Sequence, residues 1–74
     1  MQEYIINVGE IEELQTIKNI DSLDIIFARA KSTVVNGESV ILVRKYMDGR
    51  TERFDEITTL EELDTYRKGV YKYL

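Results

Sequence analysis

Apolar residues recur with two different periods along this chain, and each period predicts a different kind of element. Residues 3–8 are rich in β-branched and aromatic side chains and end at a glycine, which predicts a strand. Because successive side chains of a strand point to opposite faces, Tyr4, Ile6 and Val8 share one face and Ile5 lies on the other. We therefore expect both faces of this strand to be partly covered.

Residues 10–20 fit two different structures. Ile11, Leu14 and Ile17 have the spacing of a short helix. Alternatively, residues 14–20 pair with the first strand as the second arm of a hairpin. We prefer the helix, and the sequence leaves both interpretations open.

A second helix is predicted between Asp21 and Gly37, because apolar residues recur there at i, i+3, i+4, i+7 and i+11. The members of this apolar stripe are Leu23, Ile26, Phe27, Ala30 and Val34. Either Asp21 or Ser22 can cap the first turn, and Asn36 or Gly37 can supply the left-handed residue that ends the helix.

An Asp-Gly pair between two β-rich segments predicts a hairpin with strands at residues 39–46 and 51–57. A turn of two residues would place Arg44 opposite Arg53, and like charges that face each other are destabilising. A longer turn would shift the register and remove this conflict.

The last helix is predicted from a capping box, in which Thr59 and Glu62 satisfy the free N–H groups of the first turn. Its apolar stripe consists of Leu60, Leu63, Tyr66 and Val70. The elements occur in the order β-(short α or β)-α-β-β-α within a single domain, residues 1–74. This order predicts an α+β fold, in which a small, mainly antiparallel sheet of about three strands has two main helices packed on one face.

The composition excludes several kinds of chemistry. The chain has no Cys and no His, so disulfides, Cys/His metal sites, thiolate chemistry and the usual nucleophile–base pairs cannot be built. Walker, GxGxxG and HExxH motifs do not occur, and residues 48–52 do not match an EF-hand loop. We therefore predict no catalytic residue, no cofactor and no metal ion, and a protein that is not an enzyme.

Charge and hydropathy indicate where in the cell the protein is located. The formal net charge of −4 argues against bulk attraction to nucleic acid or to anionic membranes. No apolar run approaches the roughly 20 residues of a membrane span, and residues 1–4 do not have the pattern of a signal peptide. We therefore expect a cytoplasmic protein.

The predicted hairpin is the first candidate surface for a partner. It carries Arg44, Tyr46, Arg50 and Arg53, and the planar donor fork of arginine suits a phosphate group or an acidic protein. The alternative interpretation is that these side chains extend into solvent or pair with neighbouring acids such as Glu52.

The C-terminal helix is the second candidate surface, because three of the last nine residues are tyrosines and tyrosine is favoured at interfaces. Packing of Tyr66 and Tyr73 in the core would leave Tyr71 for a partner. We name Tyr71 and Tyr73 as the candidate contact residues.

These observations favour a non-enzymatic protein-interaction module or subunit that binds a protein partner or a second copy of itself. Two alternatives stay open. The first is a regulator of nucleic-acid machinery that acts through the hairpin arginines or by acidic mimicry, although direct binding of nucleic acid is not expected. The second is a small ligand-binding domain.

Overall fold

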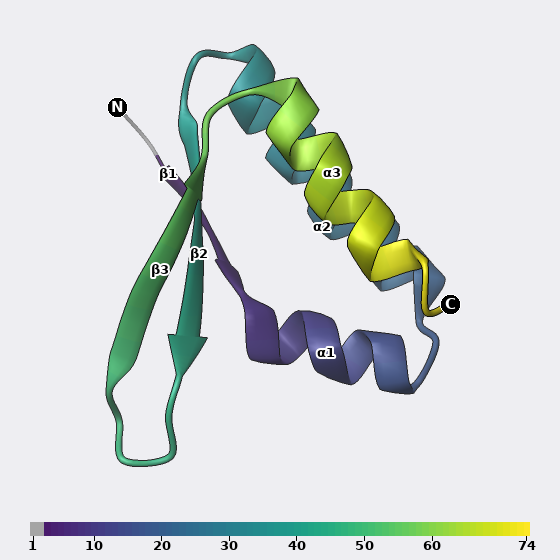
Figure 1. Cartoon of the computed structure of the whole chain (residues 1–74), viewed down its shortest axis with the longest axis vertical. Helices are drawn as coiled ribbons and strands as arrows, with labels where there is room; N and C mark the ends of the chain where they lie inside the picture. Colours follow the sequence, from purple (N-terminus) through teal and green to yellow (C-terminus); the bar gives the residue numbers. More distant parts are fainter. Residues whose placement is uncertain (1–2) are drawn as a thin grey trace.

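Three strands and three helices follow one another in the computed structural model, which describes residues 3–74 (Figure 1). They are β1 (Glu3–Asn7), α1 (Val8–Thr16), α2 (Ile20–Val35), β2 (Ser39–Lys45), β3 (Thr51–Ile57) and α3 (Leu60–Tyr71). The predicted α+β class and element order are confirmed. Within the open segment 10–20, residues 10–16 belong to α1, residues 17–19 connect the two helices, and Ile20 begins α2. Residues 1 and 2 of the predicted domain lie outside the described residues.

The sheet has the strand order β1-β2-β3 and is mixed. β2 and β3 form the antiparallel hairpin, whereas β1 lies parallel to β2 with Glu3 beside Ser39 and Asn7 beside Val43. Parallel pairing is possible because α1 and α2 together bring the chain back to the end of the sheet at which β1 begins, so that β2 can run in the same direction. All three helices lie on one side of the sheet (Figure 1).

Asparagine side chains cap the first turns of α1 and α2. β1 ends at Asn7, one residue before the predicted end, because the Asn7 Oδ1 accepts a hydrogen bond from the Gly9 N–H at 3.0 Å and caps α1. Asn19 caps α2 in the same way, with 3.1 Å from its Oδ1 to the Ser22 nitrogen. The prediction that Asp21 or Ser22 would cap this helix is therefore wrong, because Asn19, two residues before Asp21, supplies the acceptor.

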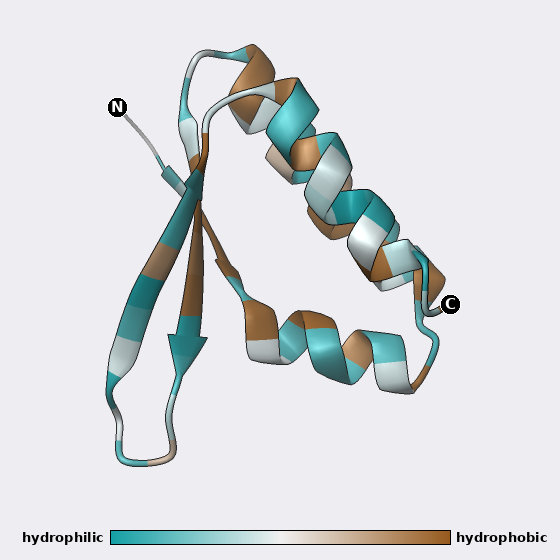
Figure 2. Cartoon of the chain, viewed as in Figure 1, coloured by the Kyte–Doolittle hydropathy of each residue, from teal (hydrophilic) through white to brown (hydrophobic). Residues whose placement is uncertain are grey.

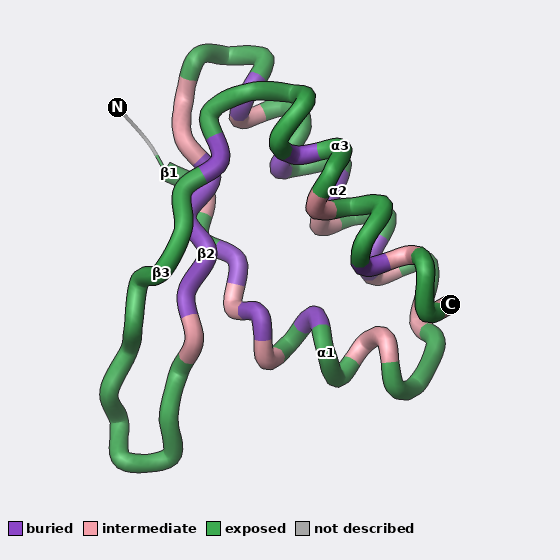
Figure 3. Tube along the Cα trace, viewed as in Figure 1, coloured by how far each residue is buried: buried purple, intermediate pink, exposed green. Residues whose placement is uncertain are grey.

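The predicted apolar stripe of α2 forms the centre of the core. Leu23 and Ala30 are fully buried, Phe27 and Val34 are nearly so, and Ile26 packs against them. The core also contains Ile6, Val8, Ile11, Val40, Leu42, Ile57, Leu63 and Val70. Apolar positions of the helices gather on the sides that face the sheet and one another (Figure 2), and buried positions follow them (Figure 3).

The hairpin has a longer turn than two residues. Lys45 pairs with Thr51 at the ends of the strands, and the Tyr46 N–H donates to the Arg50 carbonyl at 2.8 Å. A β-bulge leaves Phe54 without a partner in β2. The two-residue turn is therefore wrong, and the alternative longer turn removes the predicted facing pair of arginines.

Among residues 3–74, no helix lies on the outer face of the sheet, yet the central strand of that face is covered. Ile41 and Val43 of β2 alternate with the core residues of that strand and point away from the helices, but they are only 2% and 5% exposed. Arg53 pairs with Glu56 at 2.8 Å and approaches Glu3 of β1 at 3.8 Å, so its side chain crosses β2. We conclude that this charged bridge and the flanking strands shield the apolar centre of the outer face.

Candidate interaction surfaces

The two arginines on the hairpin strands point to opposite faces of the sheet. Arg44 lies on the helix side, where its Nη1 donates to Glu12 of α1 at 2.9 Å. Arg53 lies on the outer side, where it is held by Glu56 at 2.8 Å. A single bound phosphate or acidic side chain therefore does not contact both arginines.

The side chains at the hairpin tip pair with one another. Arg50 binds Asp48 at 2.6 Å, and its guanidinium lies 5.0 Å from the centroid of the Tyr46 ring. The Tyr46 hydroxyl donates to Glu52 at 2.8 Å, and this hydrogen bond raises the pKa of Tyr46. Each of the three candidate arginines is thus neutralised by a carboxylate of the same chain, as the alternative interpretation of the sequence allowed.

The C-terminal tyrosines are arranged differently from the predicted packing. Tyr66 is partly buried, with its ring centroid 5.7 Å from that of Phe27, and burial raises the pKa of Tyr66 to about 12. Tyr73, one of the two candidate contact residues, is 72% exposed, which overturns the alternative that packs it in the core. The helical spacing does not extend to Tyr73 because α3 ends at Tyr71, and Leu74 packs against the core instead.

Tyr71 joins α3 to α2 rather than projecting toward solvent. Its hydroxyl donates to Asp24, and its ring lies edge-on to Phe27 with 5.8 Å between centroids. The Arg67 guanidinium lies 4.5 Å from the Tyr71 ring centroid. Burial, followed by the hydrogen bond to Asp24, raises the pKa of Tyr71 to about 12. Of the two candidate tyrosines, Tyr73 is therefore the exposed one, and Tyr71 contributes to a shared cluster.

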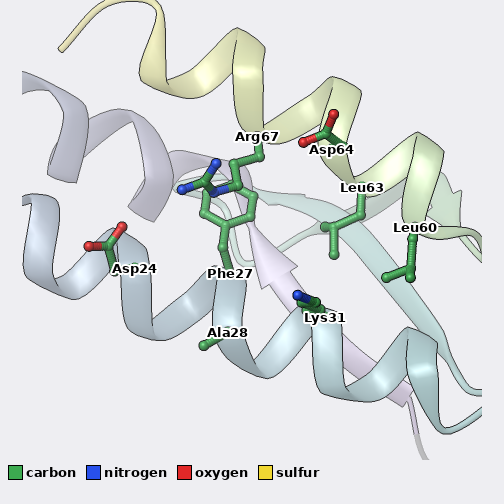
Figure 4. A pocket seen from close by; sticks show the side chains of 8 residues that line it. All are labelled: Asp24, Phe27, Ala28, Lys31, Leu60, Leu63, Asp64 and Arg67. Atoms are coloured by element: carbon green, nitrogen blue, oxygen red, sulfur yellow. The ribbon is translucent and has the colours of Figure 1, made fainter.

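A groove of about 570 Å³ lies between α2 and α3, and the sequence did not predict it. Its residues are Asp24, Phe27, Ala28, Lys31, Leu60, Leu63, Asp64 and Arg67 (Figure 4). The groove combines an apolar floor with charged side chains of both signs. The two helices run in opposite directions beside it, so that Asp24 lies toward one end and Leu60 toward the other (Figure 4).

The sequence of α2 contains a signal for this groove, on the helix face next to its buried apolar stripe. Asp24, Ala28 and Lys31 recur at i, i+4 and i+7, the spacing of one helix face. The prediction of this helix rests on its strongly apolar stripe and does not use this mixed stripe of charged and small residues. Mixed stripes are harder to identify because charged residues are also usual on solvated faces.

A second groove, of about 420 Å³, lies between α1, the hairpin and α3. Glu12 and Arg44 line it together with Phe54 and Tyr66, and these two charged side chains already form an ion pair with each other.

Within residues 3–74, no cluster of three or more acidic side chains has the geometry to hold a metal ion. Across the same residues, no helix has the length and apolar character that crossing a membrane requires.

Comparisons with known proteins add no identification to this geometry. No protein-family model matches the chain. Neither the curated proteins nor the solved structures contain a significant match to it.

Proposed function

We propose that this chain is a non-enzymatic protein-interaction module that binds a helical protein segment in the groove between α2 and α3. The observation that carries the proposal is the composition of this groove. Phe27, Ala28 and Leu63 provide an apolar floor, and Asp24 and Lys31 place opposite charges along one wall. An apolar floor supports affinity, and alternating charges select the register of a partner.

The shape of the groove favours a helix as the partner. Two antiparallel helices leave a furrow between their ridges, and a third helix packs into such a furrow at about 8–10 Å between axes. Exposed apolar side chains lie on α2 outside the groove, where Ile20 is 46% exposed and Val35 is 63% exposed, and Leu60 within the groove is 47% exposed. An amphipathic helix laid along α2 would cover these three side chains.

The titratable groups of the groove support binding rather than catalysis. Asp64 is paired with Lys68 at 2.9 Å, and Asp24 accepts a hydrogen bond from Tyr71. The chain supplies no His or Cys that could act with these carboxylates as a nucleophile or a base near neutral pH. The internal pairing of the hairpin arginines likewise favours a protein partner over nucleic acid.

Filling the groove tests the proposal. Ala28→Arg places a long side chain on the floor, and Ser32→Arg places the same side chain on an exposed part of α2 outside the groove. Each tagged variant and the wild type would be used to capture proteins from an extract of the native cell, including untagged copies of this chain. We expect a protein that binds the wild type and Ser32→Arg to be lost with Ala28→Arg. Equal capture by all three folded baits, as checked by circular dichroism, would contradict the proposal.

A further inference from the structure

We infer that the surface formed by α2 and α3 packs against the same surface of a second copy of this chain, whose α2 is the helical segment that is bound. A two-fold axis makes each helix antiparallel to its counterpart. This inference rests on the proposed function and names its partner. Two-fold dimers use the same surface on both subunits, so a surface that mediates one must be complementary to itself. The stripes of α2 and α3 that lie beside the groove have this property.

The stripe on α2 consists of Ile20, Asp24, Ala28, Lys31 and Val35, all of which are exposed. At 3.6 residues per turn they lie within about 80° of the helix circumference, beside the buried stripe. Their chemical character is apolar, acidic, small, basic and apolar. When two copies run antiparallel, Ile20 faces Val35, Asp24 faces Lys31, and the small Ala28 lies next to the axis.

The stripe on α3 has the same symmetry. It consists of Leu60, Asp64, Arg67 and Tyr71, spaced at i, i+4, i+7 and i+11 on one helix face. In an antiparallel pair, Asp64 faces Arg67 of the second copy, and Leu60 faces Tyr71. Both stripes therefore bring opposite charges together at the centre and larger side chains together at the ends.

The centres of the two stripes lie side by side, as a single two-fold axis requires. The centre of the α2 stripe falls between Phe27 and Ala28, and that of the α3 stripe falls near Tyr66. The rings of Phe27 and Tyr66 are in contact, with 5.7 Å between their centroids. One axis across the groove therefore relates both helices to their counterparts at the same time.

The charges of the α2 stripe are available for such a partner. Within residues 3–74, Lys31 makes no ion pair, although it lines the groove. The Tyr71 hydroxyl donates to the Asp24 carboxylate, which likewise forms no ion pair with residues 3–74 of its own chain. Lys31 of the second copy supplies that missing countercharge, and the two-fold axis repeats the pair.

The size of the surface indicates a dimer of moderate affinity. A helix of 16 residues is about 24 Å long, and two helices side by side are about 20 Å wide. The contact then covers about 1,000 Å² for the two copies together, at the lower limit of specific interfaces. We therefore expect dissociation in the micromolar range rather than a permanent dimer.

Charge reversal on α2 tests both the partner and the register. In Asp24→Lys, like charges face each other in a dimer of two variant copies, and the same holds for Lys31→Asp. A mixture of the two variants restores opposite charges at every contact. Sedimentation velocity from about 10 to about 500 µM would compare the wild type, each variant and the mixture, with Arg29→Asp as a matched charge change outside the groove.

We expect the wild type and Arg29→Asp to dimerise with similar dissociation constants. Each groove variant should weaken dimerisation at least about tenfold, and the equimolar mixture should recover it. If Asp24→Lys does not fold because it loses the Tyr71 contact, Asp64→Arg and Arg67→Asp provide the same test on α3.

Two results would overturn the inference. The first is a wild type that stays monomeric at the highest concentration. The second is a dimer that the groove variants do not weaken, since association then occurs elsewhere, such as at the open edge of β1. Either result leaves the proposed function intact if Ala28→Arg still abolishes capture of another protein.

Discussion

The hairpin and the α2–α3 groove both carry charged and aromatic side chains, but they use them in opposite ways. On the hairpin, Arg44, Arg50 and Arg53 are each held by a carboxylate of the same chain. In the groove, Lys31 and Asp24 are separated along one helix, and neither forms an ion pair within the described residues 3–74. The density of charge is therefore a poor guide to a binding surface, because what matters is whether the charges are already satisfied within the chain.

The largest expected difference between the two regions is in stability. Leu63 forms part of the groove floor and is 4% exposed, so Leu63→Ala should lower the free energy of unfolding by about 2–5 kcal/mol. Phe54 at the hairpin bulge is half exposed, so Phe54→Ala should cost less than about 1.5 kcal/mol. Urea unfolding measures both values. Equal losses would show that the hairpin belongs to the same core as the groove.

Alkaline pH should lower the stability of the protein mainly through two tyrosines of the helical layer, and less through the tyrosine of the hairpin. Tyr66 and Tyr71 have their pKa values raised to about 12, whereas an unfolded tyrosine ionises near 10. The folded chain holds these protons more tightly, so the resulting stability is present below pH 10 and is lost as the pH rises from about 10 toward 12.

The measurement is the melting temperature as a function of pH for the wild type and three phenylalanine variants. Tyr66→Phe and Tyr71→Phe should each reduce the alkaline fall, because neither can ionise at the helices. Tyr46→Phe on the exposed hairpin should leave most of the fall in place. A wild-type melting temperature that stays constant from pH 9 to pH 12 would contradict the raised pKa values.

A smaller effect is expected at the start of α3, the second wall of the groove. Thr59 accepts a hydrogen bond from the Glu62 N–H at 3.1 Å. Thr59→Ala should therefore destabilise the protein by about 1 kcal/mol, and Thr59→Ser should restore most of that loss. Chemical denaturation of the two variants makes the comparison. A cost of zero for Thr59→Ala would show that the groove wall does not depend on this cap.

The smallest effect is expected from the hairpin arginines. Arg44 and Arg53 remain substantially exposed in their ion pairs, and exposed pairs contribute about 0–1 kcal/mol. Arg44→Ala and Arg53→Ala should therefore leave both stability and association nearly unchanged. An electrophoretic-mobility assay at low salt with mixed nucleic acids provides the complementary check. Retardation that disappears in either variant would return the hairpin to consideration as a binding surface.

Local signals in the sequence predicted most of the elements. The apolar stripe from Leu23 to Val34 identified the longest helix, and Thr59 with Glu62 identified the start of the last one. Even there the structure differs in detail, because the Glu62 carboxylate accepts from the Thr58 N–H at 3.3 Å. This contact lowers the pKa of Glu62. Short-range hydrogen bonds of this kind depend on few residues, so sequence patterns describe them well.

Long-range features could not be predicted in the same way. The parallel pairing of β1, the bulge at Phe54 and the contact between Tyr71 and Asp24 all join residues from separate elements. Each depends on how whole elements pack, and no local propensity specifies that packing. The groove belongs to this group, since α2 defines only one of its walls.

The position of β1 also has a consequence for how the chain acquires its fold. In the part of the chain that the structure describes, β1 lies at one edge of the sheet and pairs with β2, which follows it after two complete helices. Contacts between distant segments form slowly, because a long loop must close before any pairing energy is gained. The hairpin and the helices can form from neighbouring residues, so the first strand is expected to dock last. During synthesis, β1 would therefore remain unpaired until the ribosome had added the residues of β2.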